Sequence, residues 1–186
     1  DAGRMSAPAR APAAAAPVDV SIVVPVYNER PTIAALFAEC RAALDPLGLA
    51  WEVVFVDDGS SDGSFEVVTA LQAGDPRCRG LRLRTNLGKA AALAAGFRAA
   101  RGERLVTMDG DLQDDPAEVP RLLAALDAGA DLVCGWKVDR QDSLSRVAAS
   151  RVFNAVSRLA SGVELHDMNC GLKAFRREVT TEVPLY

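Results

Sequence analysis

The sequence contains a single histidine, His166, and four cysteines that lie far apart along the chain. One histidine excludes multi-histidine metal centres and the Ser or Cys triads that rely on a second histidine. No Cys-x-x-Cys pair occurs, so the cysteines indicate neither a disulfide framework nor a thiolate zinc site, and a reducing compartment is expected. Any catalysis must therefore depend on carboxylates and on bases other than imidazole.

Several other signals are also missing. No segment approaches the roughly 18 uninterrupted apolar residues of a membrane span, so the chain as given is expected to be soluble. Neither the Gly-x-Gly-x-x-Gly dinucleotide fingerprint nor a Gly-x-x-x-x-Gly-Lys-Ser/Thr loop occurs, which argues against a standard NAD site and a P-loop. The net charge is −4, aromatic residues make up 5%, and basic and aromatic residues are not interleaved, so nucleic acid is not an expected partner.

The chain does contain enough apolar residues for one compact α/β domain, since 49% of its 186 residues are hydrophobic. Residues 1–17, rich in Ala and Pro, lack periodicity and are predicted to be a disordered leader or an expression remnant. Residues 18–186 are predicted to form the folded domain. Its C-terminal end has no closing element, so the piece is expected to be cut from something longer.

Short β-branched runs alternate with amphipathic stretches, which predicts a Rossmann-like, mostly parallel sheet flanked by helices. Strands are expected at residues 19–25, 51–57, 80–84, 104–108 and 131–135. Helices are expected at residues 31–45, 63–73, 88–101, 117–128 and 144–160. Three of the strands run into polar clusters, at residues 27–29, 57–60 and 109–111. Because open α/β sheets bind ligands at the carboxyl ends of their strands, these clusters are expected to share one crevice.

The Asp109-Gly110-Asp111 triplet is the main candidate for chemistry. In an extended chain residues i and i+2 project to the same side, so both carboxylates can aim at one point beyond the strand. Neighbouring anions repel each other unless a positive charge lies between them, and Mg²⁺ or Mn²⁺ suits oxygen ligands. The alternative is that the triplet is only a turn, since Asp and Gly are common turn formers.

Two further groups fit a nucleotide. Asp57 or Asp58 can accept a hydrogen bond from a base N–H. Residues 86–89, which open an expected helix, offer backbone N–H groups and the Lys89 ammonium to phosphate. The alternatives are a turn with a helix cap and a solvated lysine.

Residues 137–177 contain eight Lys/Arg against four acids, although the whole chain is acidic. A basic segment beside an acidic crevice can attract a second, anionic substrate. In the expected helix 144–160, Arg146 and Ser150 share a face away from an apolar stripe, so the pair can grip one phosphate. The alternative is the ordinary solvent-facing surface of an amphipathic helix.

Six motifs in this order carry a resemblance to a known family: residues 25–29 (PVYNE), 56–62 (VDDGSSD), 86–89 (NLGK), 109–116 (DGDLQDDP), 135–140 (GWKVDR) and 166–177 (HDMNCGLKAFRR). Together they resemble glycosyltransferase family 2, and within it the polyprenyl-phosphate branch of dolichyl-phosphate mannose synthases and bacterial undecaprenyl-phosphate sugar transferases. The match runs from about residue 18 to residue 185, and it implies a GT-A type fold.

The resemblance implies roles for single residues of the donor site. Asp109 and Asp111 would act in catalysis, and together with Gln113 they would bind Mg²⁺ or Mn²⁺ and the donor diphosphate. The remaining residues of the nucleotide-sugar site would be Pro25, Tyr27, Glu29, Asp57, Asp58 and Lys89, with Asp57 in a supporting place.

The resemblance also implies an acceptor site. Arg146 and Ser150 match residues that hold the lipid phosphate, and Asp167 and Lys173 fall in the acceptor-loop motif. Lys137 stands where relatives carry an arginine, and Arg140 matches an arginine of the bacterial branch. Which of Lys137 and Arg140 touches the diphosphate stays open, although Arg140 is taken with Arg146 as catalytic.

The activity implied is metal-dependent, inverting transfer of a hexose from a nucleotide sugar to undecaprenyl or another polyprenyl phosphate, with UDP favoured over GDP. The alternatives are a family 2 transferase with a sugar hydroxyl acceptor and an inactive, truncated domain that only binds the donor. The bacterial relatives usually add transmembrane helices after this point. The full-length protein is therefore expected at the cytoplasmic face of a membrane, attached through a C-terminal segment that is missing here.

Overall fold

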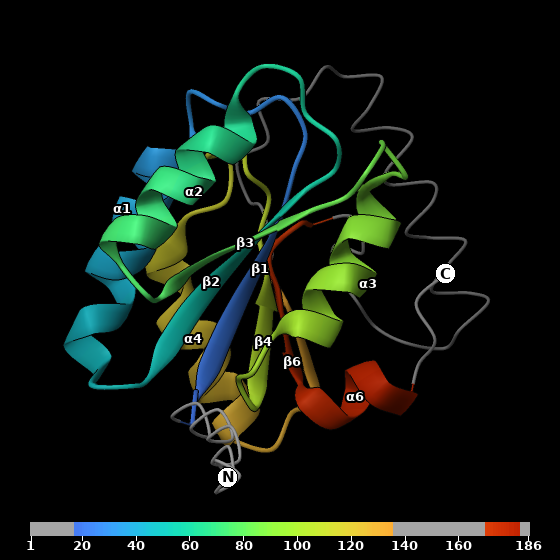
Figure 1. The fold of residues 1–186 in the computed structure, drawn as a ribbon. Helices are drawn as coiled ribbons and strands as arrows, with labels where there is room; N and C mark the ends of the chain where they lie inside the picture. The colour runs from blue at the N-terminus through green and yellow to red at the C-terminus, as the bar shows by residue number, and fades with distance from the viewer. Residues whose placement is uncertain (1–16, 136–169, 183–186) are drawn as a thin grey trace, which may run out of the picture.

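The computed structural model describes residues 17–135 and 170–182, and these form an α/β structure around a six-stranded sheet (Figure 1). The sheet order is β3-β2-β1-β4-β6-β5. The strands are β1 (Val20–Val26), β2 (Trp51–Asp57), β3 (Cys78–Arg82), β4 (Arg104–Thr107), β5 (Leu132–Cys134) and β6 (Lys173–Arg176). The pairs β1–β2, β2–β3 and β1–β4 are parallel, whereas β6 is antiparallel to both β4 and β5. The prediction of a mostly parallel α/β sheet is thus confirmed.

The five predicted strands are present, with small shifts of their ends. β3 begins two residues before the predicted 80–84, and β4 stops at Thr107 rather than at residue 108. β6 was not predicted. It is a four-residue segment whose pairing depends on β4 and β5, which are distant in sequence, so local periodicity gives little sign of it.

Helices cover both faces of the sheet. They are α1 (Ile33–Leu44), α2 (Ser64–Gly74), α3 (Lys89–Ala99), α4 (Val119–Asp127) and α6 (Arg177–Glu182), with short 3₁₀ turns η1 (Asp45–Leu47) and η2 (Pro116–Glu118). Helices α1, α2 and α4 lie on one face and α3 on the other (Figure 1). The predicted helix 144–160 lies outside the described residues, as does nearly all of the predicted leader 1–17.

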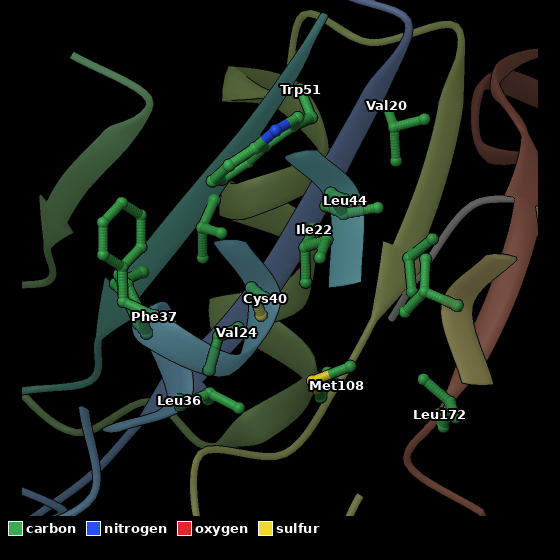
Figure 2. Packing of buried hydrophobic residues seen from close by; sticks show 14 of the residues in the cluster. Val20, Ile22, Val24, Leu36, Phe37, Cys40, Leu44, Trp51, Met108 and Leu172 are labelled. Carbon is green, nitrogen blue, oxygen red and sulfur yellow. The ribbon is translucent and has the colours of Figure 1, made fainter. Parts of the chain in front are cut away.

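Alternation along β1 explains the two layers. Ile22 and Val24 face α1, where they pack with Leu36, Cys40 and other fully buried side chains, as Figure 2 shows. Val23 points to the opposite face and joins the cluster beneath α3. A strand that is buried on both faces reads as a continuous apolar run, which is why β1 and β2 were identifiable from sequence.

The strand order decides where a ligand site lies. From β1 the chain adds β2 and β3 on one side, and it returns to place β4 on the other side of β1. The loops that leave β1 and β4 at their carboxyl ends therefore start side by side and run toward opposite edges of the sheet, which leaves a crevice between them. Such a switch point is the usual place for a ligand crevice in an open α/β sheet.

Candidate active site

A cleft of about 270 Å³ opens at the carboxyl ends of β1, β2 and β4 and at the start of α3. Its lining includes seven of the residues predicted from sequence: Pro25, Tyr27, Glu29, Asp58, Lys89, Asp109 and Asp111. Residues from four separate segments thus meet in one place, as the convergence of the polar clusters predicted. Asn86 and Gly88, from the segment 86–89 that the sequence offered to a phosphate, and Gly110, from the acidic triplet, also line the cleft, whereas sequence reasoning missed Val26.

The acid pair lies in a turn rather than in an extended chain. β4 ends at Thr107, and Gly110 and Asp111 lie in a turn followed by Leu112 with a left-handed φ of 63°. The Asp111 carboxylate accepts a hydrogen bond from the Gln113 N–H at 3.0 Å. The extended backbone expected for the pair was wrong, because Gly110 and Asp111 form a turn, as the alternative interpretation held, but both carboxylates line the same cleft.

A lysine supplies the positive charge beside the first acid of the pair. Lys89, the first residue of α3, forms an ion pair and hydrogen bond with Asp109. The Asp109 N–H donates to the Asp114 carboxylate at 3.1 Å, which fixes the backbone beneath the cleft. Within the part of the chain that the structure describes, the cleft therefore combines acidic groups with the Lys89 ammonium from the start of α3.

Glu29 faces the acid pair from the loop after β1. Its Oε2 is buried without a hydrogen-bond partner, and a Cβ built on Gly110 would lie 1.9 Å from that oxygen. Only glycine permits this approach. Burial, followed by repulsion from Asp111 and Asp109, raises the pKa of Glu29 to about 7, although the Lys89 charge acts in the opposite sense.

Asp57 and Asp58 are held by different partners. The Asp58 carboxylate accepts hydrogen bonds from the Leu87 and Gly88 N–H groups, both at 2.8 Å. These two amides, which the sequence offered to a phosphate, thus point at Asp58. Asp57 accepts from the Ser60 N–H at 3.2 Å and pairs with Arg82, its neighbour in the β2–β3 register, at 3.2 Å. Sequence reasoning missed Arg82, because the signal is a cross-strand pair rather than a local motif.

A glycine from the far end of the chain, Gly171, lies against the carboxylates of Asp109 and Asp114. The Gly171 carbonyl accepts a hydrogen bond from the Thr107 hydroxyl at 2.7 Å, which holds the segment before β6 against β4. A Cβ on Gly171 would lie 2.5 Å from Asp109 Oδ2 and 2.8 Å from Asp114 Oδ2. The position was inside a recognised motif, but its contact with Asp109 was not predicted.

The remaining predicted site residues do not line the cleft or cannot be placed. Lys173 lies in β6, opposite Thr107 and Cys134, and neither it nor Gln113 is among the lining residues. Lys137, Arg140, Arg146, Ser150 and Asp167 lie outside the described residues. The predicted acceptor site therefore stays a prediction.

The described part of the cleft fits a cation that shares its coordination with a substrate. No group of three or more His, Cys, Asp or Glu side chains within residues 17–135 and 170–182 is arranged to hold a metal ion alone. Mg²⁺ usually binds through one or two carboxylates together with substrate phosphates and water. The Asp109 and Asp111 carboxylates, with the buried and unpaired Glu29 oxygen nearby, match that donor set.

Solved structures with the same architecture define the class of protein. Glucosyl-3-phosphoglycerate synthase from Mycobacterium tuberculosis in complex with phosphoglyceric acid gives a TM-score of 0.72 at 26% identity, covering 90% of this chain and 60% of that chain. The mannosyltransferase PcManGT from Pyrobaculum calidifontis, in complex with GDP-Man and Mn²⁺, gives a TM-score of 0.65 at 27% identity, covering 89% and 46%. The fold is that of GT-A glycosyltransferases, as the sequence predicted.

Sequence comparison then gives the family. Residues 21–183 match the model of Glycosyl transferase family 2, and the chain belongs to this family. It is 42% identical over 167 residues to undecaprenyl-phosphate 4-deoxy-4-formamido-L-arabinose transferase from Salmonella paratyphi A, covering 89% of this chain and 51% of that protein. The chain thus spans about half the length of the curated relatives it matches, and the resemblance to the polyprenyl-phosphate branch is confirmed.

Within residues 17–135 and 170–182, no helix is both long enough and apolar enough to cross a bilayer.

Proposed function

We propose that this chain carries the catalytic domain of an inverting transferase that moves a hexose from a nucleotide sugar to a polyprenyl phosphate. The donor is a UDP-sugar and the acceptor is undecaprenyl phosphate. The acceptor is supported by the 42% identical relative, an undecaprenyl-phosphate sugar transferase. The donor is supported by a similar structure crystallised with Mn²⁺ and UDP, whereas another was crystallised with GDP-Man.

The observation that carries the proposal is the convergence of Glu29, Asp109 and Asp111 on one cleft with Lys89 at its edge. Three acids gathered at a sheet edge are unfavourable unless a cation joins them. Burial raises the pKa of Glu29 first, and repulsion from Asp111 and Asp109 raises it further. A nucleoside diphosphate can enter such a cleft only with a cation that offsets its own charge, so donor and cation are expected to bind together.

The described residues have distinct tasks in this proposal. Pro25 and the half-exposed Tyr27 form the apolar wall that receives the nucleoside, and Asp58 is held rigid by two backbone N–H groups. Asp109 and Asp111 would hold Mg²⁺ or Mn²⁺, assisted by Gln113. The bound cation supplies positive charge that stabilises the departing nucleoside diphosphate. Lys89 is near enough to Asp109 to add its own charge at the same place.

The acceptor needs no general base. A phosphate ester has a second pKa of about 6, so its oxygen is already ionised near neutral pH and can attack the anomeric carbon directly. Catalysis then depends on positioning two anions and on neutralising the leaving group. In-line attack inverts the anomeric centre. Arg146 and Ser150, with Lys137 or Arg140, are proposed to hold the lipid phosphate and the diphosphate, and Asp167 and Lys173 to order the acceptor loop.

The test is Asp111→Asn, assayed with undecaprenyl phosphate and a UDP-sugar in the presence of Mn²⁺. Loss of the carboxylate charge should reduce the rate about 100-fold or more, which corresponds to ~3 kcal/mol of transition-state stabilisation. Asp115→Asn removes an equal charge from the same loop, outside the cleft lining, and should keep nearly full activity. Full activity of the Asp111 variant would remove the proposed site.

A second candidate is transfer to a sugar hydroxyl, which requires a base. Among the described residues, Glu29 is a cleft carboxyl with a pKa of about 7, a value suited to accepting a proton near neutral pH. Parallel assays with glycan and with polyprenyl phosphate distinguish the two candidates. A third outcome, binding of UDP and Mn²⁺ without any transfer, would identify a donor-binding but inactive domain. Membrane attachment at the cytoplasmic face stays a prediction.

A further inference from the structure

The second half of the Asp57–Ser64 loop has no assigned role. Asp58 lines the cleft, but Ser60, Asp62 and Ser64 do not. Their side chains turn instead toward the loop that leaves β1. Both Ser60 and Ser64 are buried, so each hydroxyl must find a partner inside the protein.

Each of the three side chains accepts a hydrogen bond from one backbone N–H of residues 28–30. The Asn28 N–H donates to Ser60 Oγ at 2.9 Å, and the Glu29 N–H donates to Ser64 Oγ at 3.0 Å. The Arg30 N–H donates to Asp62 Oδ2 at 3.0 Å. Three consecutive amides of one loop are thus held by alternate side chains of the other, an arrangement that we term the amide clamp.

The clamp is linked internally by the Asp62 carboxylate. The Ser64 hydroxyl donates to Asp62 Oδ1 at 2.6 Å, and the Ser64 N–H donates to the same oxygen at 3.0 Å. Because the Ser64 hydrogen is committed to Asp62, its oxygen is oriented to accept from Glu29. These hydrogen bonds, that from the Ser64 hydroxyl first, lower the pKa of Asp62, so the bonds of the clamp that end on Asp62 are charge-assisted.

The loop that the clamp holds carries two walls of the cleft. Tyr27 and Glu29 both line it, and the residue between them, Asn28, has a left-handed φ of 56°. The Asn28 side chain returns a bond, because its Oδ1 accepts from the Ser61 N–H at 3.0 Å. Asp109 and Asp111 repel the Glu29 carboxylate. The hydrogen bonds that the Glu29 and Arg30 N–H groups donate hold the backbone in place against this repulsion.

We propose that Ser60, Asp62 and Ser64 are positioning residues of the donor site, which act by holding the Asn28–Arg30 backbone so that Tyr27 and Glu29 face the nucleotide. The inference rests on the proposed function for the identity of the ligand. In this proposal the first half of the Asp57–Ser64 loop lines the cleft through Asp58, and the second half holds the loop after β1 in position.

Hydrogen–deuterium exchange tests the clamp without any ligand. In Ser64→Ala and Asp62→Ala, amide exchange in a peptide covering residues 26–32 should become about tenfold faster, equivalent to about 1.4 kcal/mol, because each variant loses a hydrogen bond that holds these amides. Thr69→Ala is the matched control. Its hydroxyl, also on α2, donates to the Phe65 carbonyl at 2.9 Å and contacts no part of the clamp, so exchange in residues 26–32 should not change.

Nucleotide affinity tests the consequence for the site. The Kd for UDP with Mn²⁺, measured by titration calorimetry on folded protein, should rise about tenfold in either variant and stay unchanged in Thr69→Ala. Asp62→Asn retains one acceptor oxygen, so its Kd should lie between those of wild type and Asp62→Ala. Ser64 acts partly through Asp62. In the double variant the Kd should therefore rise by a smaller factor than the product of the factors in the two single variants.

The outcomes separate the inference from the function on which it rests. Unchanged exchange in both single variants would overturn the clamp, whatever the affinities. Faster exchange with unchanged Kd would also overturn the positioning role, because the loop would then be held for stability alone. If wild-type protein binds neither UDP nor GDP with Mn²⁺, the proposed function fails and the positioning role fails with it, while exchange still reports whether the amides are held.

Discussion

At the scale of single residues, the cleft is organised by charge. Lys89 pairs with Asp109 across the cleft, and its ammonium occupies the region where a divalent cation would approach that carboxylate. The pair is partly exposed, with side-chain accessibilities of 54% for Lys89 and 31% for Asp109, so it is weak enough to be displaced. An incoming cation must compete with the lysine, which is then free to contact the diphosphate.

Lys89→Met should therefore strengthen Mn²⁺ binding in the absence of nucleotide. Removal of the competing ammonium is expected to lower the Kd about fivefold, equivalent to ~1 kcal/mol, as measured by electron paramagnetic resonance of free Mn²⁺. Arg98→Met removes one charge from the exposed side of the same helix and serves as the control. Equal Kd values for Lys89→Met and wild type would show that Lys89 does not compete for Asp109.

Glu29 should make the stability of the protein depend on pH. Its pKa is raised from an ordinary 4.5 to about 7, so the folded state binds more protons than the unfolded state between these values. The free energy of unfolding should fall as pH rises through this window and then level off. Glu29→Gln removes the titration. The variant should match wild type near pH 5 and exceed it by about 1 kcal/mol at pH 8, since partial exposure weakens the effect.

Urea unfolding of both proteins at pH 5, 6, 7 and 8 measures this difference. A constant gap between Glu29→Gln and wild type across the series would show that Glu29 does not titrate in this range.

At the scale of the elements, a buried acid holds together the ends of the strands that lie opposite the cleft. Glu52, near the start of β2, is completely buried and accepts hydrogen bonds from Ser21 at 2.7 Å and from the Arg101 N–H at 2.7 Å. Arg79 and Arg101 form ion pairs with it at 3.0 and 2.6 Å. Burial acts to raise the pKa of Glu52, but these hydrogen bonds lower it overall. The network joins β1, β2, β3 and the end of α3.

Glu52→Gln should destabilise the fold without altering the donor site. Loss of the buried charge leaves two arginines without their partner, and the free energy of unfolding should fall by about 3 kcal/mol, as measured by chemical denaturation. Nucleotide Kd should stay unchanged wherever the protein is folded, because the network lies at the far end of the strands. Glu66→Gln, with a side chain 69% exposed, should change stability by less than about 0.5 kcal/mol. A similarly small effect at Glu52 would contradict the network's role.

At the scale of the whole molecule, the site is completed by a segment distant in sequence. Gly171 precedes β6 and lies against Asp109 and Asp114, and β6 joins β4 to β5 in the sheet. Two successive arginines, the last residue of β6 and the first of α6, bond to opposite faces of the sheet. Arg176 donates to the Leu126 carbonyl at 2.7 Å near the end of α4, and Arg177 donates to the Ala100 carbonyl at 2.9 Å after α3. The C-terminal segment thus connects both helical layers to the strand that precedes Asp109.

Gly171→Ala should weaken the donor site from this distance. The added Cβ would lie 2.5 Å from Asp109 Oδ2, so the carboxylate must move, and the Kd for Mn²⁺ with UDP should rise about tenfold. Gly74→Ala is a suitable control, because nothing lies within 4 Å of a Cβ at that position. Titration calorimetry on both variants measures the difference. Unchanged affinity in Gly171→Ala would show that Asp109 tolerates a shift of this segment.

Sequence by itself determined most of the architecture and seven of the residues that line the cleft. β1 and β2 are continuous apolar runs, so they were identifiable as buried parallel strands, and their carboxyl ends located Tyr27, Glu29 and Asp58 at one edge. Such features are local in the chain, because side-chain periodicity and strand ends depend on near neighbours.

Only the tertiary structure decided how those residues act on one another. The Lys89–Asp109 pair, the approach of Glu29 to Gly110 and the amide clamp each join segments from different loops. The antiparallel β6 likewise depends on partners distant in sequence. These contacts exist because the sheet order places β2 and β4 on either side of β1 and β6 beside β4. A pattern within a single segment does not contain the position of another segment.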